Sequence, residues 1–180
     1  IGLRVGIIGQ PDINSDVDIK RLGEPKLFWG VSGGSIDSMV SNYTATKKFR
    51  NDDDYTPGGK NNKRPDRATL VYTNLIRRYF KNTVPIVLGG IEASLRRLTH
   101  YDYWSNTLTK PILFDSKADY MVYGMGEQAI IDLGLYLRDG KDVRTIAGLC
   151  YISKEPVKEY VQIPSHKECL ENKEKYIDLF

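Results

Sequence analysis

The sequence predicts an α/β domain built on a doubly wound, mostly parallel β-sheet. Three observations support this fold class. Short, almost continuously apolar runs recur along the 180 residues, as is typical of strands buried on both faces. Helical patterns with a period near 3.6 residues lie between several of these runs. Loops rich in glycine and polar residues follow the runs, as expected at the carboxyl ends of parallel strands.

Five apolar runs are predicted as strands, namely residues 3–8, 27–31, 86–88, 120–123 and 149–152. A helix is predicted over residues 68–79, where apolar residues recur at helical spacing and Asp66 can serve as the N-cap. A second helix, over residues 129–137, ends before Gly140, which suits the position after a helix. Ser35 can cap a shorter helix. Alternating strands and helices predict a parallel sheet.

The last segment is predicted to be a helical linker. A capping box formed by Ser165 and Glu168 begins it, and helical spacing continues to Ile177. The pattern reaches the last residue without a terminating Gly or Pro, and the chain does not begin with Met, so we expect a longer natural protein. We therefore divide the chain into an α/β domain, residues 1–163, and a linker, residues 164–180.

A long polar insert, residues 41–67, interrupts the pattern. It contains Pro57-Gly58-Gly59 and few apolar residues. Connections of this length are uncommon in compact domains and are usually functional or disordered. Two interpretations stay open: a flexible surface insert, or a loop that orders against a partner domain or ligand, with Tyr55 and Arg64 as contacts.

The composition is that of an ordinary soluble protein, with 41% hydrophobic and 27% charged residues. No apolar run approaches the roughly 18 residues needed to cross a bilayer, so we expect a cytoplasmic protein without a membrane partner. The net charge of +3, and the mixture of acidic and basic residues between Lys47 and Arg67, argue against a nucleic-acid partner. Cys150 and Cys169 are predicted to be reduced thiols, and no metal site is predicted because no metal-ligand spacing is present.

Four loops are predicted to bring polar residues to one edge of the sheet. They are Gly9-Gln10-Pro11-Asp12, Ser32-Gly33-Gly34-Ser35, Gly89-Gly90-Ile91-Glu92-Ala93-Ser94 and Gly124-Met125-Gly126-Glu127. Glycine allows close backbone approach, and helix N-termini suit anions, although neither GxGxxG nor a P-loop is present. The candidate binding residues are Gln10, Asp12, Ser32, Gly33, Gly34, Gly89, Gly90, Glu92, Ser94, Arg96, Arg97, His100, Asp102, Gly124, Gly126 and Glu127.

Several of these candidates have a simpler structural explanation. The serine–glycine loop at residues 32–35 can be a tight turn, and Glu127 can complement a helix dipole. Arg96 and Arg97 can form a solvated pair or bind a carboxylate or phosphate. Glu92 is harder to explain in this way, because a carboxylate at a strand end needs a partner or a ligand.

Catalytic roles are not predicted for any residue. Ser94, His100 and Asp102 are the residue types of a nucleophilic triad, but triads are recognised by geometry and not by closeness in sequence. The aromatic residues Tyr101, Tyr103 and Trp104 favour packing over base stacking, since aromatic side chains dominate cores and interfaces.

The chain resembles the N-terminal domain of the YgiQ-type radical SAM proteins. The matching stretches are Val5 to Asp12, Phe28 to Val31, Asp37 to Val40, Tyr55 to Gly59, Lys63 to Ala68, Gly89 to Arg97, His100 to Trp104, Asp115 to Asp119 and Tyr123 to Glu127. The resemblance implies a parent protein whose radical SAM domain, joined in cis, binds a [4Fe-4S] cluster and S-adenosylmethionine through a CxxxCxxC motif. That motif is absent here, so this chain is expected to bind neither and not to perform the radical step. The substrate and the reaction stay unassigned.

The resemblance also implies a flavodoxin-like fold similar to cobalamin-binding domains. In the vitamin-binding proteins of that fold, a DxHxxG motif after the first strand supplies a histidine to cobalt. The corresponding loop here, Gly9-Gln10-Pro11-Asp12, has no histidine, which argues against histidine-ligated cobalamin and leaves open cobalamin bound without that ligand. The leading hypothesis is an accessory domain that shapes a substrate or cofactor cleft against the catalytic domain. The alternatives are a stand-alone module that binds cobalamin or a nucleotide, and a purely structural interaction domain.

Overall fold

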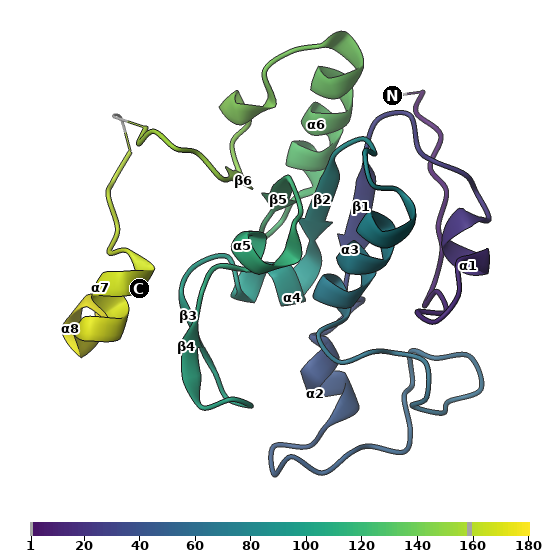
Figure 1. The fold of residues 1–180 in the computed structure, drawn as a ribbon, viewed down its shortest axis with the longest axis horizontal. Helices are drawn as coiled ribbons and strands as arrows, with labels where there is room; N and C mark the ends of the chain where they lie inside the picture. The colour runs from purple at the N-terminus through teal and green to yellow at the C-terminus, as the bar shows by residue number, and fades with distance from the viewer. Residues whose placement is uncertain (1, 158–159) are drawn as a thin grey trace.

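A four-stranded sheet forms the centre of the computed structural model, which describes residues 2–157 and 160–180 (Figure 1). The strands are β1 (Trp29–Ser32), β2 (Ile86–Gly89), β5 (Tyr120–Val122) and β6 (Leu149–Tyr151), in the order β1-β2-β5-β6. The first three are parallel, and β6 is antiparallel to β5. The predicted class, a mostly parallel α/β sheet of the flavodoxin-like kind, is confirmed.

Helices lie on both faces of the sheet. One face packs against α1 (Val17–Lys20), α3 (Ala68–Tyr79), α4 (Gly90–Leu95) and α5 (Ile112–Ser116). The other packs against α6 (Glu127–Asp139) and a short 3-10 turn, Val143–Thr145. Along β2, Ile86 and Leu88 belong to the first core and Val87 to the second. This two-sided burial explains why the strand is continuously apolar.

Smaller elements surround the sheet. α2 (Ser38–Asn42) precedes the long insert, and β3 (His100–Asp102) pairs with β4 (Thr107–Thr109) in an antiparallel hairpin. Beyond the hairpin lie α7 (His166–Glu171) and α8 (Lys173–Ile177) (Figure 1). The amide of Tyr101 donates a hydrogen bond of 3.2 Å to the hydroxyl of Tyr176, which joins α8 to the hairpin.

The predicted C-terminal helix begins where the sequence placed it, but it is divided into two helices and is not continuous. Ser165 and Glu168 form the predicted capping box. The helix then ends, and Asn172 caps α8 by accepting a hydrogen bond from the amide of Glu174 at 2.8 Å. Asparagine favours such capping positions over helix interiors, because its side chain competes for backbone amides. The division at residue 163 stays a prediction.

Residues 3–8 do not form the predicted strand. They belong to no strand, and Val5 and Ile7 are 83% and 86% exposed. An apolar β-branched run has a high strand propensity, yet a strand also needs a neighbour for its backbone hydrogen bonds. Among the described residues, no strand pairs with this segment.

Two of the predicted helix caps are wrong, and one helix end is confirmed. Asp37, and not Ser35, caps α2 by accepting a hydrogen bond from the amide of Met39 at 2.9 Å. Arg67, in the left-handed region at φ 53°, occupies the N-cap position of α3 in place of Asp66. The Asp66 carboxylate instead accepts hydrogen bonds from the side chains of Asn42 in α2 and of Tyr43, the C-cap of that helix. Gly140 ends α6 in the left-handed region at φ 65°, as predicted.

The insert packs against its own domain. Within it, Arg64 and Asp53 form a buried ion pair with an N···O distance of 3.1 Å. Arg64 also donates a hydrogen bond of 2.9 Å to the carbonyl of Gly33, which lies just beyond β1. The Arg64 side chain is therefore an internal anchor and not an external contact. Tyr55 is exposed, with its ring centroid 5.9 Å from the Arg64 guanidinium carbon, and its contact with a partner stays a prediction.

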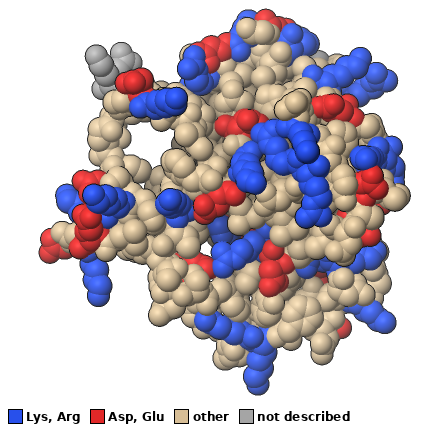
Figure 2. All heavy atoms as spheres, in the orientation of Figure 1, with Lys and Arg blue, Asp and Glu red and all other residues tan. Residues whose placement is uncertain are grey.

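The surface carries both signs of charge. Figure 2 shows Lys and Arg side chains, some of them grouped near the centre of this face, interspersed with Asp and Glu side chains. This face therefore does not present the uniform positive field that favours nucleic acid. Within the described ranges, no helix has the length and apolarity needed to cross a membrane.

Candidate functional site

Three of the four predicted loops meet at the carboxyl edge of the sheet. Because β1, β2 and β5 are parallel, the segments that begin at Gly33, Gly90 and Tyr123 emerge on the same edge. The amide of Gly124 donates a hydrogen bond of 3.1 Å to the hydroxyl of Ser94, which joins the segments after β5 and β2. The fourth loop, with Gln10 and Asp12, belongs to the unpaired N-terminal segment.

The glycines at this edge make room for the domain's own side chains. A Cβ atom at Gly33 would overlap the carboxylate of Glu92, and one at Gly90 would lie 2.6 Å from the hydroxyl of Ser32. Gly90 also has a φ of 80°, which strains any other residue. A Cβ at Gly126 would overlap Val122. The close approach predicted for these glycines is thus used for internal packing.

The carboxylate of Glu92 is completely buried and binds the N-termini of two helices. Its Oε2 atom accepts a hydrogen bond from the amide of Ser38 in α2, and Oε1 accepts one from the amide of Thr69 in α3, both at 2.9 Å. These amides lack partners within their own helices, and the positive end of each helix dipole favours the negative charge. Glu92 therefore holds α2, α3 and α4 together. The two backbone amides are the partners that a carboxylate at a strand end was expected to need.

Arg96 and Arg97 lie in different environments. Arg96 is largely buried, forms an ion pair with Asp37 and donates a hydrogen bond of 3.1 Å to the carbonyl of Glu92. It therefore links α4 to the cap of α2. Arg97 is exposed, with its guanidinium carbon 5.5 Å from the ring centroid of Tyr123. Of these two arginines, Arg97 is therefore the one that a ligand or partner could reach.

Asp102 and His100 are engaged within the hairpin region. The Oδ2 atom of Asp102 accepts hydrogen bonds from Arg67 at 2.7 Å and from the hydroxyl of Ser105 at 2.6 Å. The Nδ1 atom of His100 lies 3.1 Å from the carbonyl of Leu98, and its Nε2 lies 2.7 Å from the Thr109 hydroxyl. Burial lowers the pKa of His100, so its ring is neutral at neutral pH.

The triad geometry does not form. The hydroxyl of Ser94 donates a hydrogen bond of 2.8 Å to the carbonyl of Gly90 and accepts the one from Gly124. Neither His100 nor Asp102 shares a hydrogen bond with Ser94 or with the other in the part of the chain that is described. Nucleophilic catalysis by these three residues is therefore not supported.

Asp102 should make stability depend on pH. Burial by itself raises the pKa of Asp102, but hydrogen bonds from Ser105 and Arg67 outweigh it and lower that pKa from 3.8 to about 2. Because the pKa is lower in the folded state, the ionised Asp102 carboxylate stabilises the fold above pH ~4. This stabilisation is lost as pH falls toward 2 and the carboxylate is protonated. We expect Asp102→Asn to remove about 2 kcal/mol of acid-dependent stability. Unfolding measured at pH 6, 4 and 2 checks this, and equal pH dependence in both proteins would contradict it.

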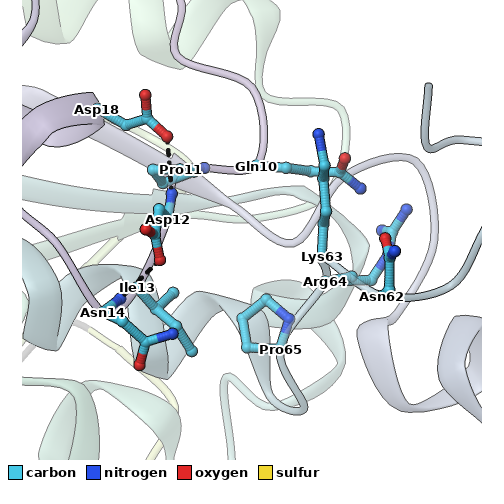
Figure 3. A pocket seen from close by; sticks show the side chains of 10 residues that line it. All are labelled: Gln10, Pro11, Asp12, Ile13, Asn14, Asp18, Asn62, Lys63, Arg64 and Pro65. Atoms are coloured by element: carbon cyan, nitrogen blue, oxygen red, sulfur yellow. Dashed lines mark hydrogen bonds between the residues drawn. The ribbon is translucent and has the colours of Figure 1, made fainter.

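A polar cavity of about 420 Å³ lies beside the carboxyl end of β1 (Figure 3). Figure 3 shows Asp12 and Asn14 on one side and Lys63 and Pro65 on the other. Gln10, at its rim, donates a hydrogen bond of 2.6 Å to the hydroxyl of Thr56 in the insert. Gln10 and Asp12 thus belong to this cavity and not to the Ser94–Gly124 region. The full lining is Gln10, Pro11, Asp12, Ile13, Asn14, Asp18, Asn62, Lys63, Arg64 and Pro65.

The residues present do not fit a resident metal centre. Within the described residues, no group of three or more His, Cys, Asp or Glu side chains could hold a metal ion. A [4Fe-4S] cluster on three cysteines does not fit a chain that has two. Burial raises the pKa of the Cys150 thiol, which keeps it protonated. For cobalt, both ring nitrogens of His100 are already within hydrogen-bond distance of protein oxygens.

Exposed apolar side chains border the carboxyl edge, and sequence reasoning missed them. Ile91 and Leu95 project from α4, while Tyr123 and Met125 follow β5, and Met125 is 91% exposed. The Ser94–Gly124 hydrogen bond places the two pairs beside each other. Apolar surface gathered in this way is typical of interaction sites. The available signal was Met125, an apolar residue between two glycines in a loop.

The fold and this edge define a doubly wound α/β domain whose loops are tied together internally and bordered by exposed apolar side chains. The model of the Radical SAM N-terminal family matches residues 1–180, and the chain belongs to that family. The resemblance stated from sequence is thereby confirmed.

Several curated relatives are UPF0313 proteins. The chain is 61% identical over 180 residues to one from Fusobacterium nucleatum. It is 53% identical over 180 residues to one from Thermotoga maritima and 49% identical over 184 residues to one from Clostridium botulinum. The alignments cover 99%, 98% and 99% of this chain but 32%, 32% and 28% of the relatives, so the chain spans about a third of their length. No solved structure matches the chain.

Proposed function

We propose that residues 1–180 act as the accessory N-terminal domain of a radical SAM protein. In this proposal a catalytic domain outside this chain carries the [4Fe-4S] cluster and S-adenosylmethionine. The carboxyl edge of the sheet faces that domain and helps to shape the substrate or cofactor cleft. Family membership and the length of the relatives support the arrangement.

The observation that carries the proposal is the exposed apolar border of the carboxyl edge. Glu92, Arg96 and Asp102 are engaged in internal bonds, so the edge is not a self-contained polar pocket. What it offers to the outside is apolar surface around Leu95 and Met125. We assign to the cleft those predicted site residues that stay accessible beside this surface, namely Ser94, Arg97, Gly124 and Glu127.

Charged substitutions on this border should weaken the contact between the two domains of the full-length protein. We expect Leu95→Lys and Met125→Lys each to increase hydrogen exchange of residues 91–95 and 123–126 by about tenfold or more, because burying one apolar side chain contributes ~1.5–3 kcal/mol. Proteolysis between the domains should accelerate in parallel. Both are measured on the full-length protein by mass spectrometry.

Phe114→Lys provides the matched control. Phe114 is also an exposed apolar residue, but it lies on α5, which leads into the amino end of β5. This variant should behave like the wild type. If Leu95→Lys and Met125→Lys do so as well, the carboxyl edge does not face the catalytic domain.

A stand-alone ligand-binding module is a second candidate, and the polar cavity favours it. A volume of about 420 Å³ falls within the range of ~300–1,000 Å³ that is typical of small-molecule sites. Opposed Asp12 and Lys63 suit a small ligand that carries both signs of charge. Titration of the full-length protein with cobalamin and with nucleotides tests this candidate. Binding that is lost in Lys63→Ala would favour it, whereas no binding by the wild type would remove it.

A further inference from the structure

The outer edge of β1 is open for strand pairing. β1 stands at the end of the strand order, and its residues pair in register with β2 on one side. The amide of Trp29 donates to the carbonyl of Pro85 on that side, at 2.9 Å. Because backbone groups of successive residues point to opposite sides of a strand, the N–H and C=O groups of Gly30 and Ser32 point away from β2. No strand in the described part of the chain pairs with them.

One face of β1 is also uncovered. Val31 packs in the core beneath α3, whereas Gly30 and Ser32 lie on the face that α6 covers over β2 and β5. Both residues are exposed. A Cβ atom at Gly30 would have one neighbour, the ring edge of Phe28 at 3.9 Å. Parallel sheets are normally covered on both faces, so the helical layer on the α6 side ends short of β1.

A second unpaired segment lies on the same side of the sheet. Residues 3–8 have the apolar pattern of a buried strand, yet Val5 and Ile7 are largely exposed. Figure 1 shows this segment beyond β1, on the side away from β2. At its start, Leu3 approaches α6 so closely that a Cβ at Gly134 would lie 3.0 Å from it. Two strand-forming segments, β1 and residues 3–8, therefore lie on the same side of the sheet, and no described residue forms a strand that pairs with both.

We propose that a β-strand from the part of the full-length protein outside residues 1–180 docks between β1 and residues 3–8. It pairs in parallel with the open edge of β1 and, on its other side, gives residues 3–8 the partner that their sequence pattern requires. A helix joined to this strand covers Gly30 and Ser32.

Two observations favour this occupant over other partners. The relatives are about three times as long as this chain, so the full-length protein has ample sequence to supply a strand and a helix. The open edge also belongs to a parallel sheet, whose strands are usually protected on both faces and rarely left to pair with foreign chains. The inference concerns the lateral edge of β1 and is independent of the carboxyl edge, so either proposal can fail alone.

Hydrogen exchange of the full-length protein tests the inference at single residues. We expect the amides of Gly30 and Ser32 to exchange on the order of 100-fold more slowly than unprotected amides. The amide of Val31, which faces β2, is the internal reference and should be protected in either case. Fast exchange at Gly30 and Ser32 beside a protected Val31 would overturn the proposal. Protection that increases with protein concentration would assign the edge to a second copy of the chain and also overturn it.

A pair of variants at Gly30 gives a second measurement in the full-length protein. Gly30→Pro removes the outward N–H and leaves the hydrogen bonds to β2 intact. Gly30→Ala keeps this N–H, and the position has room for the added methyl group. We expect the proline variant to increase exchange of residues 3–8 at least tenfold over the alanine variant, since losing a strand hydrogen bond and its geometry is worth ~1.4 kcal/mol or more. Equal exchange in the two variants would show that no strand pairs with this edge.

Discussion

Glu92→Ala is expected to lower the free energy of unfolding of this domain by about 3–5 kcal/mol. The substitution leaves the amides of Ser38 and Thr69 buried without an acceptor, and each unsatisfied donor costs ~1–3 kcal/mol. A cavity at the centre of three helices adds to that loss. Because both helix N-termini depend on one carboxylate, α2 and α3 should open together. Residue-resolved hydrogen exchange of the full-length protein measures this opening.

Two further substitutions separate the role of Glu92 from that of an ordinary acidic residue. Glu92→Gln keeps the shape and one oxygen acceptor but turns an NH₂ group toward a backbone N–H. Its free energy of unfolding should therefore lie between those of the wild type and Glu92→Ala. Glu127→Ala removes an exposed carboxylate from the first turn of α6, where the helix dipole is worth ~0.3–1 kcal/mol. If Glu92→Ala costs no more than Glu127→Ala, the two-helix bond does not stabilise the domain.

The sheet could be predicted from sequence because burial leaves a pattern. Along residues 86–88, every side chain enters one core or the other, and an unbroken apolar run is the result. The same apolar pattern gave a wrong prediction at residues 3–8, because it indicates a tendency to form a strand but not whether a neighbouring strand is present to pair with it. The prediction that Asp66 caps α3 was wrong for a related reason. The amide of Thr69 binds Glu92, 23 residues away in sequence, and local spacing cannot reveal such a contact.

The sequence predicted the position of the candidate site better than it predicted which of its side chains are free to bind a ligand. Parallel strands carry their following loops to one edge, so Ser94 and Gly124 could be expected to meet there. Whether a polar side chain is free or already bonded depends on contacts that the sequence does not display. Asp37 is a case of this kind, because its ion pair with Arg96 spans 59 residues. The exposed Met125 was overlooked because only the glycines and the acidic residue of its loop were chosen as candidates.

The insert offers the second large effect. Replacing Arg64 with alanine is expected to destabilise residues 50–64 by about 3–5 kcal/mol, because it leaves the Asp53 carboxylate buried without its counter-charge. The two side chains are only 4% and 1% exposed, and Arg64 also satisfies the carbonyl of Gly33. Hydrogen exchange and limited proteolysis within the insert of the full-length protein measure the loss. Arg144→Ala breaks an exposed ion pair with Asp142 and should have little effect on stability, because solvent screens exposed ion pairs.

The pair can be distinguished from simple packing by removing both charges. Arg64→Met combined with Asp53→Leu eliminates the buried charges, so the double variant should lose less stability than Arg64→Ala alone. A double variant that opens the insert as fully as the single one would show that shape and the Gly33 hydrogen bond, and not charge, hold it. Since Arg64 joins the insert to the end of β1, opening it should also expose the cavity that Gln10 and Asp12 line. The buried ion pair and the hydrogen bond to Gly33 therefore make the insert part of the domain's framework.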